Sequence, residues 1–492
     1  MGKSIKNIIY KVFWGIFFCA FLAVFCKVLF ADNIHNNKPG ILILWMLVGT
    51  GIAVLAYYLL NRFSVVIKKY YKIILAVFLV IYGITVVVNG FLLRFTPAFD
   101  MDAIYGGAIQ WIEKGTFFDY HEYFGYFPNN LGAMTVLHFV FSIASVFGVS
   151  DYFAVGIIFN SFIIIMTVLV VSLVCRKLMG EVAGVMALVF FMLCVPFLVM
   201  GAAFYTDSLS VLFPALFYYL YLKFREQETL KKRLIYSVLM GLALAVGMLI
   251  KFTVLIILVA VVIDALLSVN WKNVCLFTAC SLFIAFITFG IMNTYMYYEH
   301  LDKETCDNLK TPYLHWVMMG MQNNGYYNPG DYEFTRSLAP EDRNKACLNV
   351  IKERIGGMGL SGMAELFMNK AAVCFGDGTY ALSDFLDDTP ANETWLHKYV
   401  LYDGEKYVSY RYFTTGQLLV VYLLMLLGAV RCLMEKGLNR CRTLAPSLAA
   451  LGILSFLLLW ETSGRYFTNF VPLMIICAVL SFGWKKGGKE DV

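Results

Sequence analysis

Two carboxylates open a polar connection near residue 96, and they are the first side chains that could act as a catalytic base. Asp100 and Asp102 lie two residues apart, directly after an apolar run that ends near residue 95. Partial loss of hydration at a lipid–water boundary raises the pKa of a carboxylate, toward the range that suits a general base. Because Asp is also a favoured helix N-cap, either residue could instead cap the following helix, and one of them could do each job.

Three more isolated charges lie in short polar connections. Asp207 stands between two apolar segments, where it could also cap a helix. Lys251 follows the apolar run 234–250, where a cation could simply complement a helix dipole. Arg465, followed by Tyr466, lies in a late connection. Since Arg and Lys are the residues that hold phosphate, the set predicts chemistry on a phosphate-bearing substrate.

The elements that must position these residues are membrane helices. The chain has 492 residues, of which 60% are apolar and 15% charged, with a mean hydropathy of +0.72, whereas soluble proteins carry about 25% charged residues. A span needs roughly 20 apolar residues, and thirteen segments are candidates: 8–30, 41–60, 72–95, 129–148, 151–175, 182–200, 208–223, 234–250, 252–269, 273–298, 416–430, 443–460 and 466–483. The composition therefore predicts an all-α polytopic membrane protein.

Thirteen spans are one too many if both termini are cytoplasmic. The segment 129–148 follows Pro128 and contains no basic residue. We predict that it lies along, or dips into, the outer leaflet, which leaves about 12 transmembrane helices plus an outer-face juxtamembrane helix. The alternative is an ordinary span with a weak charge signal.

The charge distribution predicts the orientation. Residues 299–414 hold 17 acidic and 11 basic side chains, so the rest of the chain carries the excess of positive charge. Basic residues in short loops favour the cytoplasmic side, and they cluster at Lys3/Lys6/Lys11, Arg62/Lys68/Lys69/Lys72, Arg176/Lys177, Lys223/Arg225/Lys231/Lys232/Arg233, Arg431/Lys436/Arg440/Arg442 and Lys485/Lys486/Lys489. We therefore expect a cell-membrane protein with both termini in the cytoplasm and with Asp100, Asp207, Lys251 and Arg465 on the outer face.

Four regions follow from this topology. We expect an N-terminal transmembrane hairpin at 1–70, a transmembrane module at 71–298 with a first outer loop at 96–150, a small extracytoplasmic subdomain at 299–414, and C-terminal helices with a cytoplasmic tail at 415–492. In the subdomain, helix-period runs at 340–356 and 360–374 are predicted to break at Gly356-Gly357. The sequence is compatible with a disulfide bond between Cys306 and Cys347, without requiring one.

The order and sidedness of these residues resemble the GT-C integral-membrane glycosyltransferases of the protein-O-mannosyltransferase and aminoarabinose-transferase type (glycosyltransferase family 39), in the bacterial branch. The resemblance rests on the outer Asp after a span, the second Asp after one hairpin, the Lys that closes a later helix, and the late Arg-Tyr. The stretches Phe99-Asp100 to Tyr105 and Tyr123-Phe124 to Gly132 are also similar. The likeness covers most of 72–484, and this chain has Asp-Met-Asp where many members have two adjacent acids.

The resemblance implies transfer of a hexosyl or pentosyl group from a polyprenyl-phosphate sugar, with inversion. It implies Asp100, Asp102 and Asp207 as the catalytic acids, with Asp100 as the presumed base. Lys251, Arg465 and Tyr466 would bind the donor phosphate. The acceptor side would be shaped by Tyr105, His315 and Asp377. A divalent cation, Mg²⁺ or Mn²⁺, is permitted without being required.

The expected partners are a lipid-linked sugar donor, an acceptor that is a cell-surface glycan, lipid or protein, and the membrane lipids. No nucleic acid is expected, and the sequence contains no nucleotide fingerprint or metal-spaced His/Cys cluster. A transporter or flippase of lipid-linked or polymer precursors is the main alternative, and a non-catalytic membrane scaffold is the other.

Overall fold

The computed structural model of the chain describes residues 3–31, 34–386, 390–434 and 444–483. Within these residues the regular structure is helical, and the only β-type contact is an isolated antiparallel bridge between Phe95 and Pro390. Helices prevail because a chain in lipid must satisfy its backbone hydrogen bonds within each segment. The predicted fold class, an all-helical membrane protein, is confirmed.

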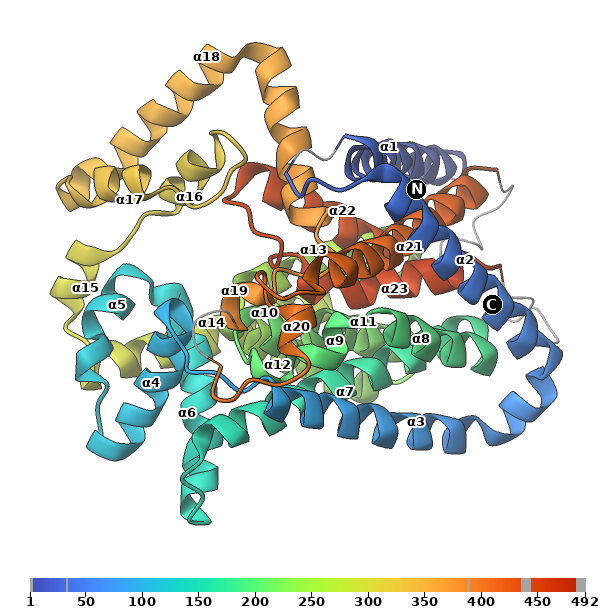
Figure 1. Cartoon of the computed structure of the whole chain (residues 1–492), viewed down its shortest axis with the longest axis horizontal. Coiled ribbons are helices and arrows are strands. Elements are labelled where there is room, and N and C mark those ends of the chain that lie inside the picture. The colour runs from blue at the N-terminus through green and yellow to red at the C-terminus, as the bar shows by residue number, and fades with distance from the viewer. Residues whose placement is uncertain (1–2, 32–33, 387–389, 435–443, 484–492) are drawn as a thin grey trace.

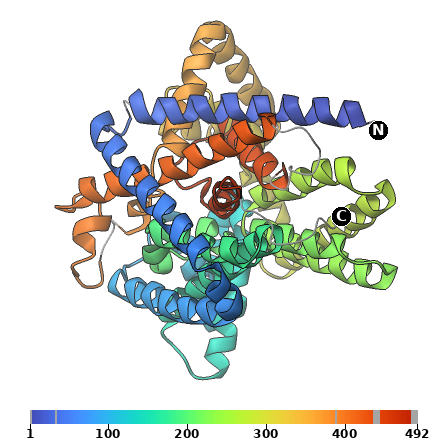
Figure 2. The ribbon, with the colours of Figure 1, turned by 90° about the vertical axis from the view of Figure 1, so that its right-hand side faces the viewer.

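The apolar helices gather into one bundle (Figure 1). They are α1 (Lys3–Phe30), α2 (Pro39–Arg62), α3 (Ser64–Leu92), α7 (Tyr152–Met179), α8 (Glu181–Leu193), α9 (Pro196–Val199), α11 (Leu212–Arg225), α12 (Leu230–Ile250), α13 (Leu255–Ser268), α14 (Trp271–Glu299), α21 (Tyr407–Met434), α22 (Leu444–Leu459) and α23 (Val471–Leu480). Figure 2 shows α23 end-on at the centre of the bundle, and every residue of this helix is buried. Because α23 packs against α7, α8, α21 and α22, the C-terminal helices complete the core that the earlier ones begin.

Eight helices are long and apolar enough to cross a membrane, and a ninth candidate is the pair Glu181–Leu193 and Pro196–Ala202, which bends by 68°. Three expected spans are shorter helices, at Phe252–Ser268, Leu444–Leu459 and Thr468–Leu480. The expected span at 208–223 forms only the 14 residues of α11. The described residues thus support eight to nine candidate spans, and the total of twelve stays a prediction.

The connection between α3 and α7 folds into helices that pack on one another. It contains α4 (Phe99–Lys114), α5 (His121–Tyr126) and α6 (Leu131–Val146), with 3-10 turns η1 (Phe118–Tyr120) and η2 (Pro128–Asn130) between them. By length and composition Pro128–Val146 is one of the eight candidate spans. In Figure 1, however, α6 runs across the direction of α3 and α7, and it packs mainly on α4. Its place in the outer leaflet also stays a prediction.

The polar stretch after α14 forms further helices. They are α15 (Lys303–Leu309), α16 (Tyr313–Gly320), α17 (Pro329–Arg336), α18 (Pro340–Phe375), α19 (Ser383–Leu386) and α20 (His397–Val400). A small separate core lies beneath α16 and α18, made of Met318, Met321, Cys347, Ile351 and Leu366. The predicted break between the runs 340–356 and 360–374 is present, but it lies at Gly359, which has φ 61°, and the helix continues through Gly356-Gly357. Cys306 and Cys347 are both free thiols.

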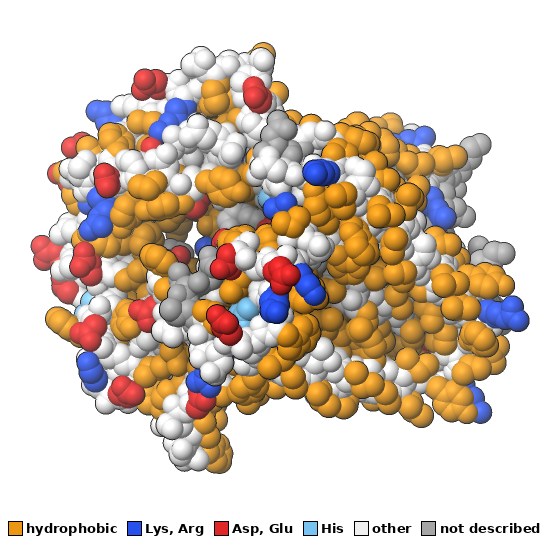
Figure 3. Space-filling model, in the orientation of Figure 1, with side chains coloured by type: hydrophobic (Ala, Val, Ile, Leu, Met, Phe, Trp, Pro, Cys, Tyr) orange, Lys and Arg blue, Asp and Glu red, His pale blue; other side chains and the backbone are white. Residues whose placement is uncertain are grey.

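The two ends of the molecule differ in charge. Figure 3 shows an apolar surface over much of the bundle, basic side chains at its right-hand edge, and mixed acidic and basic side chains on the left, where Figure 1 places α15 to α17. The connection from α2 to α3, which carries Arg62 and Lys68, lies at the right-hand end in Figure 1. This separation agrees with the charge asymmetry of the sequence. The basic residues at 436–442 and 485–489 lie outside the described residues.

Candidate active site

Asp100 lies in the first turn of α4 and accepts two hydrogen bonds from tyrosines. The hydroxyl of Tyr123 donates to Oδ1 at 2.8 Å, and the hydroxyl of Tyr205 donates to Oδ2 at 3.2 Å. Asn130, at the start of α6, donates in turn to the Tyr123 oxygen at 2.6 Å. The carboxylate of Asp100 is therefore held by tyrosines from two separate segments of the chain, and Asn130 supports one of them.

Neither acid of the first connection caps α4. The N-cap is Ala98, and it makes no side-chain capping bond. Phe99, the first residue of the helix, has φ 49°, which is a left-handed conformation rare for a bulky residue. Asp102 accepts a 3.4 Å hydrogen bond from Tyr120, and partial burial raises its pKa above the ordinary value while that bond lowers it. The capping interpretation is thus wrong for both, and they occupy different surroundings on the same helix.

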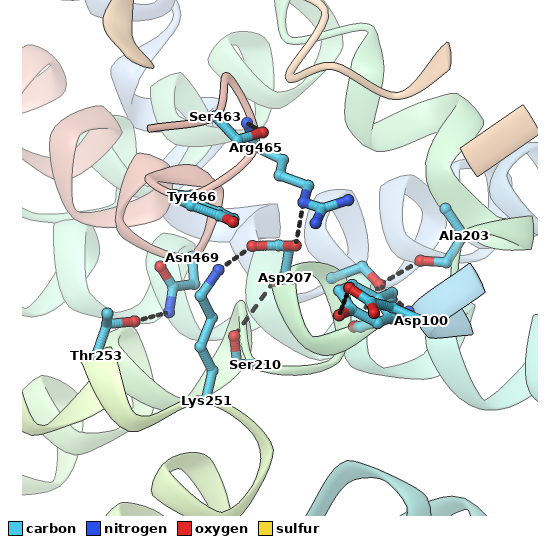
Figure 4. Close-up of polar contacts among 12 residues, drawn as sticks. Asp100, Ala203, Asp207, Ser210, Lys251, Thr253, Ser463, Arg465, Tyr466 and Asn469 are labelled. Atoms are coloured by element: carbon cyan, nitrogen blue, oxygen red, sulfur yellow. Dashed lines mark hydrogen bonds and ion pairs between the residues drawn. The ribbon is translucent and has the colours of Figure 1, made fainter. Parts of the chain in front are cut away.

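Asp207 is a buried carboxylate that lies between two cations (Figure 4). The ammonium of Lys251 pairs with Oδ1, and the Nε of Arg465 lies 3.6 Å from Oδ2. The Asp207 side chain is 4% exposed, and burial of an unpaired charge would be costly. The capping interpretation of Asp207 is wrong too, because α10 (Thr206–Leu209) has Tyr205 as its N-cap and α11 begins only at Leu212.

A serine shapes the turn that presents Tyr205 and Asp207. The Ser208 hydroxyl donates to the carbonyl of Ala203 at 2.5 Å and accepts from the backbone N–H of Tyr205 at 3.2 Å. The second bond belongs to the capping box that begins α10 at Thr206. The serine therefore fixes where this short helix starts.

Lys251 takes an extended conformation directly after α12 ends. Helix α6 packs against this end of α12 at Gly132, where an added Cβ would collide with the carbonyl group of Leu249. The ammonium of Lys251 lies 4.9 Å from the centre of the Tyr466 ring. Lys251 thus has a charged partner and an aromatic neighbour, so it does more than complement the dipole of α12.

Aromatic rings surround the guanidinium of Arg465. Its central carbon lies 5.2 Å from the ring centre of Tyr205, 4.9 Å from that of Phe385 and 5.5 Å from that of Tyr466. Such cation–π contacts gain strength when the cation is desolvated. Tyr205 therefore contacts both halves of the site, with its hydroxyl on Asp100 and its ring beside Arg465.

A second buried acid stands behind the cations. Glu461 is 7% exposed and accepts a 3.3 Å hydrogen bond from the hydroxyl of Tyr466. Loss of hydration raises its pKa to about 7, an effect that the charge of Arg465 opposes. Glu461 therefore supports the ring that lies between Lys251 and Arg465, and it titrates near neutral pH.

The loop that carries Glu461 and Arg465 is tied to the polar subdomain. The fully buried ammonium of Lys370, on α18, donates to the carbonyl oxygens of Gly320 and Trp460 at 2.7 Å each. Thr462 donates from its N–H to the carbonyl of Gly325 and from its hydroxyl to that of Asn324, both at 2.7 Å. Three of these bonds fix the loop against α18 and the turn after α16, and the fourth joins Lys370 to α16.

Three of the predicted site residues lie away from this cluster. Tyr105 packs among the rings of Phe141, Phe153 and Phe204. His315 is fully buried in the subdomain, where its Nδ1 lies 2.8 Å from the hydroxyl of Thr335 and burial lowers its pKa to about 4. The expected role of both residues on the acceptor side stays a prediction.

Asp377 is the third. Its carboxylate accepts hydrogen bonds from the N–H and hydroxyl of Thr379, at 2.9 and 2.7 Å, and from the N–H of Ala381 at 2.9 Å. These bonds shape the turn between α18 and α19. The turn lies next to Gly464, since a Cβ added there would lie 3.2 Å from Oδ2 of Asp377.

Sequence reasoning did not assign roles to Tyr205, Glu461, Phe385 or Lys370. The first two stand beside Asp207 and Arg465 in the sequence, and that adjacency was the available signal. Lys370 has no comparable signal, because its acceptors come from distant segments. In the part of the chain that the structure describes, no group of three or more His, Cys, Asp or Glu side chains is placed to hold a metal ion, and we route no step through one.

A protein-family model described as "Conserved hypothetical integral membrane protein" matches residues 1–485. The chain belongs to this family. A comparison with curated proteins finds no match. Membership of this integral membrane family covers the N-terminal hairpin, the ion cluster and the subdomain together, so the protein is a multi-pass integral membrane protein along nearly its whole length.

Proposed function

We propose that the protein is a glycosyltransferase that moves a sugar from a polyprenyl-phosphate carrier to a hydroxyl group on the outer face of the membrane. The observation that carries this proposal is that Tyr205 contacts both Asp100 and Arg465. Its hydroxyl holds Asp100, and its ring lies beside Arg465, so a carboxylate base and a buried cation pair face one small region.

The cation pair supplies a phosphate site. Lys251 and Arg465 share one carboxylate, that of Asp207, so two cations lie close together in a buried setting. Arg and Lys favour phosphate oxygens, and such contacts are stronger where water is excluded. Asp207 then acts as a positioning residue for the cations, because both of its oxygens face them.

Asp100 supplies the base. The oxygen of the acceptor hydroxyl bonds to the anomeric carbon as the bond from that carbon to the phosphate oxygen breaks. The proton passes to Asp100, and the bonding electrons leave with the phosphate, whose charge Lys251 and Arg465 stabilise. A direct displacement of this kind inverts the anomeric centre. Asp102, which has a raised pKa, is the alternative base on the same helix.

The topology completes the proposal. We take the helices as twelve spans, including the shorter α11, α13, α22 and α23, with α6 as the outer-face juxtamembrane helix. In this arrangement α4, α6 and the subdomain at 299–414 cover the outer side, both termini are cytoplasmic, and the bundle sits in the cell membrane. The arrangement of α6 across α3 and α7 supports it (Figure 1).

The test compares three carboxylate variants in proteoliposomes supplied with a polyprenyl-phosphate sugar fraction. Asp100→Asn should reduce transfer by about 10²–10⁴-fold, the usual contribution of a general base, while Glu113→Gln, an exposed acid on the same helix, should leave it unchanged. Asp102→Asn decides between the two acids. Full transfer by Asp100→Asn would remove it as the base, and no turnover of the donor by the wild type would exclude the enzyme class in favour of a flippase.

A further inference from the structure

A cavity of about 320 Å³ lies on the other side of the Arg465 loop from the ion cluster. Its polar lining includes Asp377, Asp384, Tyr402, Tyr407 and Arg411. Small-molecule sites occupy about 300–1,000 Å³ and present a few placed polar groups. The cavity has that size, and it has more polar lining than packing alone explains.

One cation of the cavity has unused donor capacity. The Nε of Arg411 is buried and makes no hydrogen bond within the described residues. The guanidinium lies about equally far from two rings, with its central carbon 5.9 Å from the centre of Tyr407 and 6.0 Å from that of Tyr412. A buried donor left unsatisfied is costly, so this group is suited to a ligand oxygen.

Carboxylates face the same space. Asp384 accepts a 2.5 Å hydrogen bond from the hydroxyl of Tyr402, and Asp377 lines the wall with its turn. Two acids and one Arg disfavour an anion as the ligand. They favour a molecule whose groups both donate and accept hydrogen bonds, and the rings of Tyr402 and Tyr407 offer faces for its C–H groups.

Two residues that line the cavity are each followed in the chain by a residue at the ion cluster. Asp384 lines the cavity, and the next residue, Phe385, packs against Arg465. Gly464 lines the cavity, and the next residue is Arg465 itself.

We propose that this cavity binds a neutral saccharide, and that it is the binding site for the acceptor's sugar. The assignment of this saccharide as the acceptor rests on the proposed function, whereas saccharide binding itself does not. Sugar hydroxyls donate to carboxylates and accept from a guanidinium, so Asp384 and Arg411 together fit such a ligand better than an apolar or an anionic one.

The test measures binding without any donor. Purified protein in nanodiscs is mixed with the methyl glycosides of glucose, galactose, mannose and N-acetylglucosamine, and contact is read by saturation-transfer NMR. We expect signal from at least one glycoside and at least a tenfold weaker affinity in Arg411→Gln and in Asp384→Asn. Lys398→Gln, an exposed residue outside the cavity lining, is the matched control and should bind as the wild type does.

Two results would overturn the proposal. One is that no glycoside binds to the wild-type protein, and the other is that both cavity variants bind glycosides as tightly as the wild type does. If Arg411→Gln does not fold, judged by its unfolding temperature, Asp384→Asn alone carries the comparison. Asp100→Asn separates the two proposals, because it should lose transfer and keep glycoside binding. If the wild type binds glycosides but transfers no sugar, the proposed transferase activity is wrong and the saccharide site stands. If it transfers sugar but binds no glycoside, the saccharide site is wrong and the transferase activity stands.

Discussion

The hydroxyl of Tyr205 donates to Asp100 across a sequence separation of 105 residues, and the bond measures 3.2 Å. We expect Tyr205→Phe to lower kcat about tenfold with little change in the donor KM, because the ring beside Arg465 remains while the hydrogen bond to the base is lost. Tyr205→Leu should raise the donor KM as well. Steady-state kinetics check both, with Tyr298→Phe, a highly exposed tyrosine, as the control. Equal kinetics for the Phe and Leu variants would contradict the division of roles.

The ion cluster predicts strong coupling between Asp207 and Lys251. Asp207→Asn should destabilise the protein by about 3–5 kcal/mol, because it leaves buried cations without their partner. Adding Lys251→Met should recover part of this loss. The double variant should therefore lose less unfolding free energy than the losses of the two single variants added together. Thermal unfolding in detergent measures the cycle. Asp119→Asn, which removes the exposed partner of Lys114, should change the unfolding temperature far less, because exposed ion pairs contribute little to stability. Additive effects at Asp207 and Lys251 would refute the coupling.

Glu461 predicts a pH dependence of stability. Burial raises its pKa from 4.5 to about 7, so the folded protein binds a proton in that interval that the unfolded chain has released. Stability from this group is complete below pH 4.5 and is lost as the pH rises through 7, by about 3 kcal/mol at most. The unfolding temperature of the wild type should therefore fall more between pH 5 and 7.5 than that of Glu461→Gln. Glu365→Gln, an exposed acid on α18, should follow the wild type, and parallel curves for all three would rule out Glu461.

Phe99 predicts a gain in stability on substitution. Its φ of 49° is a left-handed conformation that glycine adopts freely, and its side chain is 84% exposed. Phe99→Gly should raise stability by about 1 kcal/mol because it removes backbone strain, whereas the β-branched Phe99→Val should lower it. Thermal unfolding measures both. A less stable glycine variant would show that the Phe99 side chain contributes more than its conformation costs.

The proposed outer position of α6 predicts the accessibility of the turn that follows it. In a variant without native cysteines, Ser150→Cys should react with a membrane-impermeant maleimide added outside intact cells. Glu228→Cys, between α11 and α12, should react only after the cells are opened. Labelling of Ser150→Cys from the inside alone would make 129–148 an ordinary span.

Much of the site could be predicted because charge is scarce in this chain. Asp207, Lys251 and Arg465 stood out as isolated charges, and the expected topology placed them on one face, where the structure brings them into contact. Lys370 could not be found in this way. It lies in a stretch with 28 charged residues, and its burial depends on carbonyl groups of Gly320 and Trp460, which no local pattern reveals.

Two helix boundaries were predicted inaccurately because local sequence patterns did not reveal them. Hydropathy marks the apolar run at 208–223 as continuous, but α10 ends at Leu209 and α11 begins only at Leu212. Pro214 has no N–H to donate to the carbonyl of Ser210, so a helix through both residues is interrupted there. The glycine pair at 356–357 suggested a break because glycine weakens helices. The chain instead bends at Gly359, the one glycine of this helix with positive φ.

The bonds from Lys370 and Thr462 have a consequence for how such a protein can be altered or can diverge. The stretch 299–414 looks like an insertion that could be exchanged for another, but it supplies the carbonyl groups on which the Arg465 loop rests. A chimaera that replaces this stretch would need to bring its own support for residues 460–462, or it would lose the geometry of a cluster whose charged residues all lie elsewhere. The subdomain is part of the scaffold of the membrane site, so the two are expected to change together over evolution.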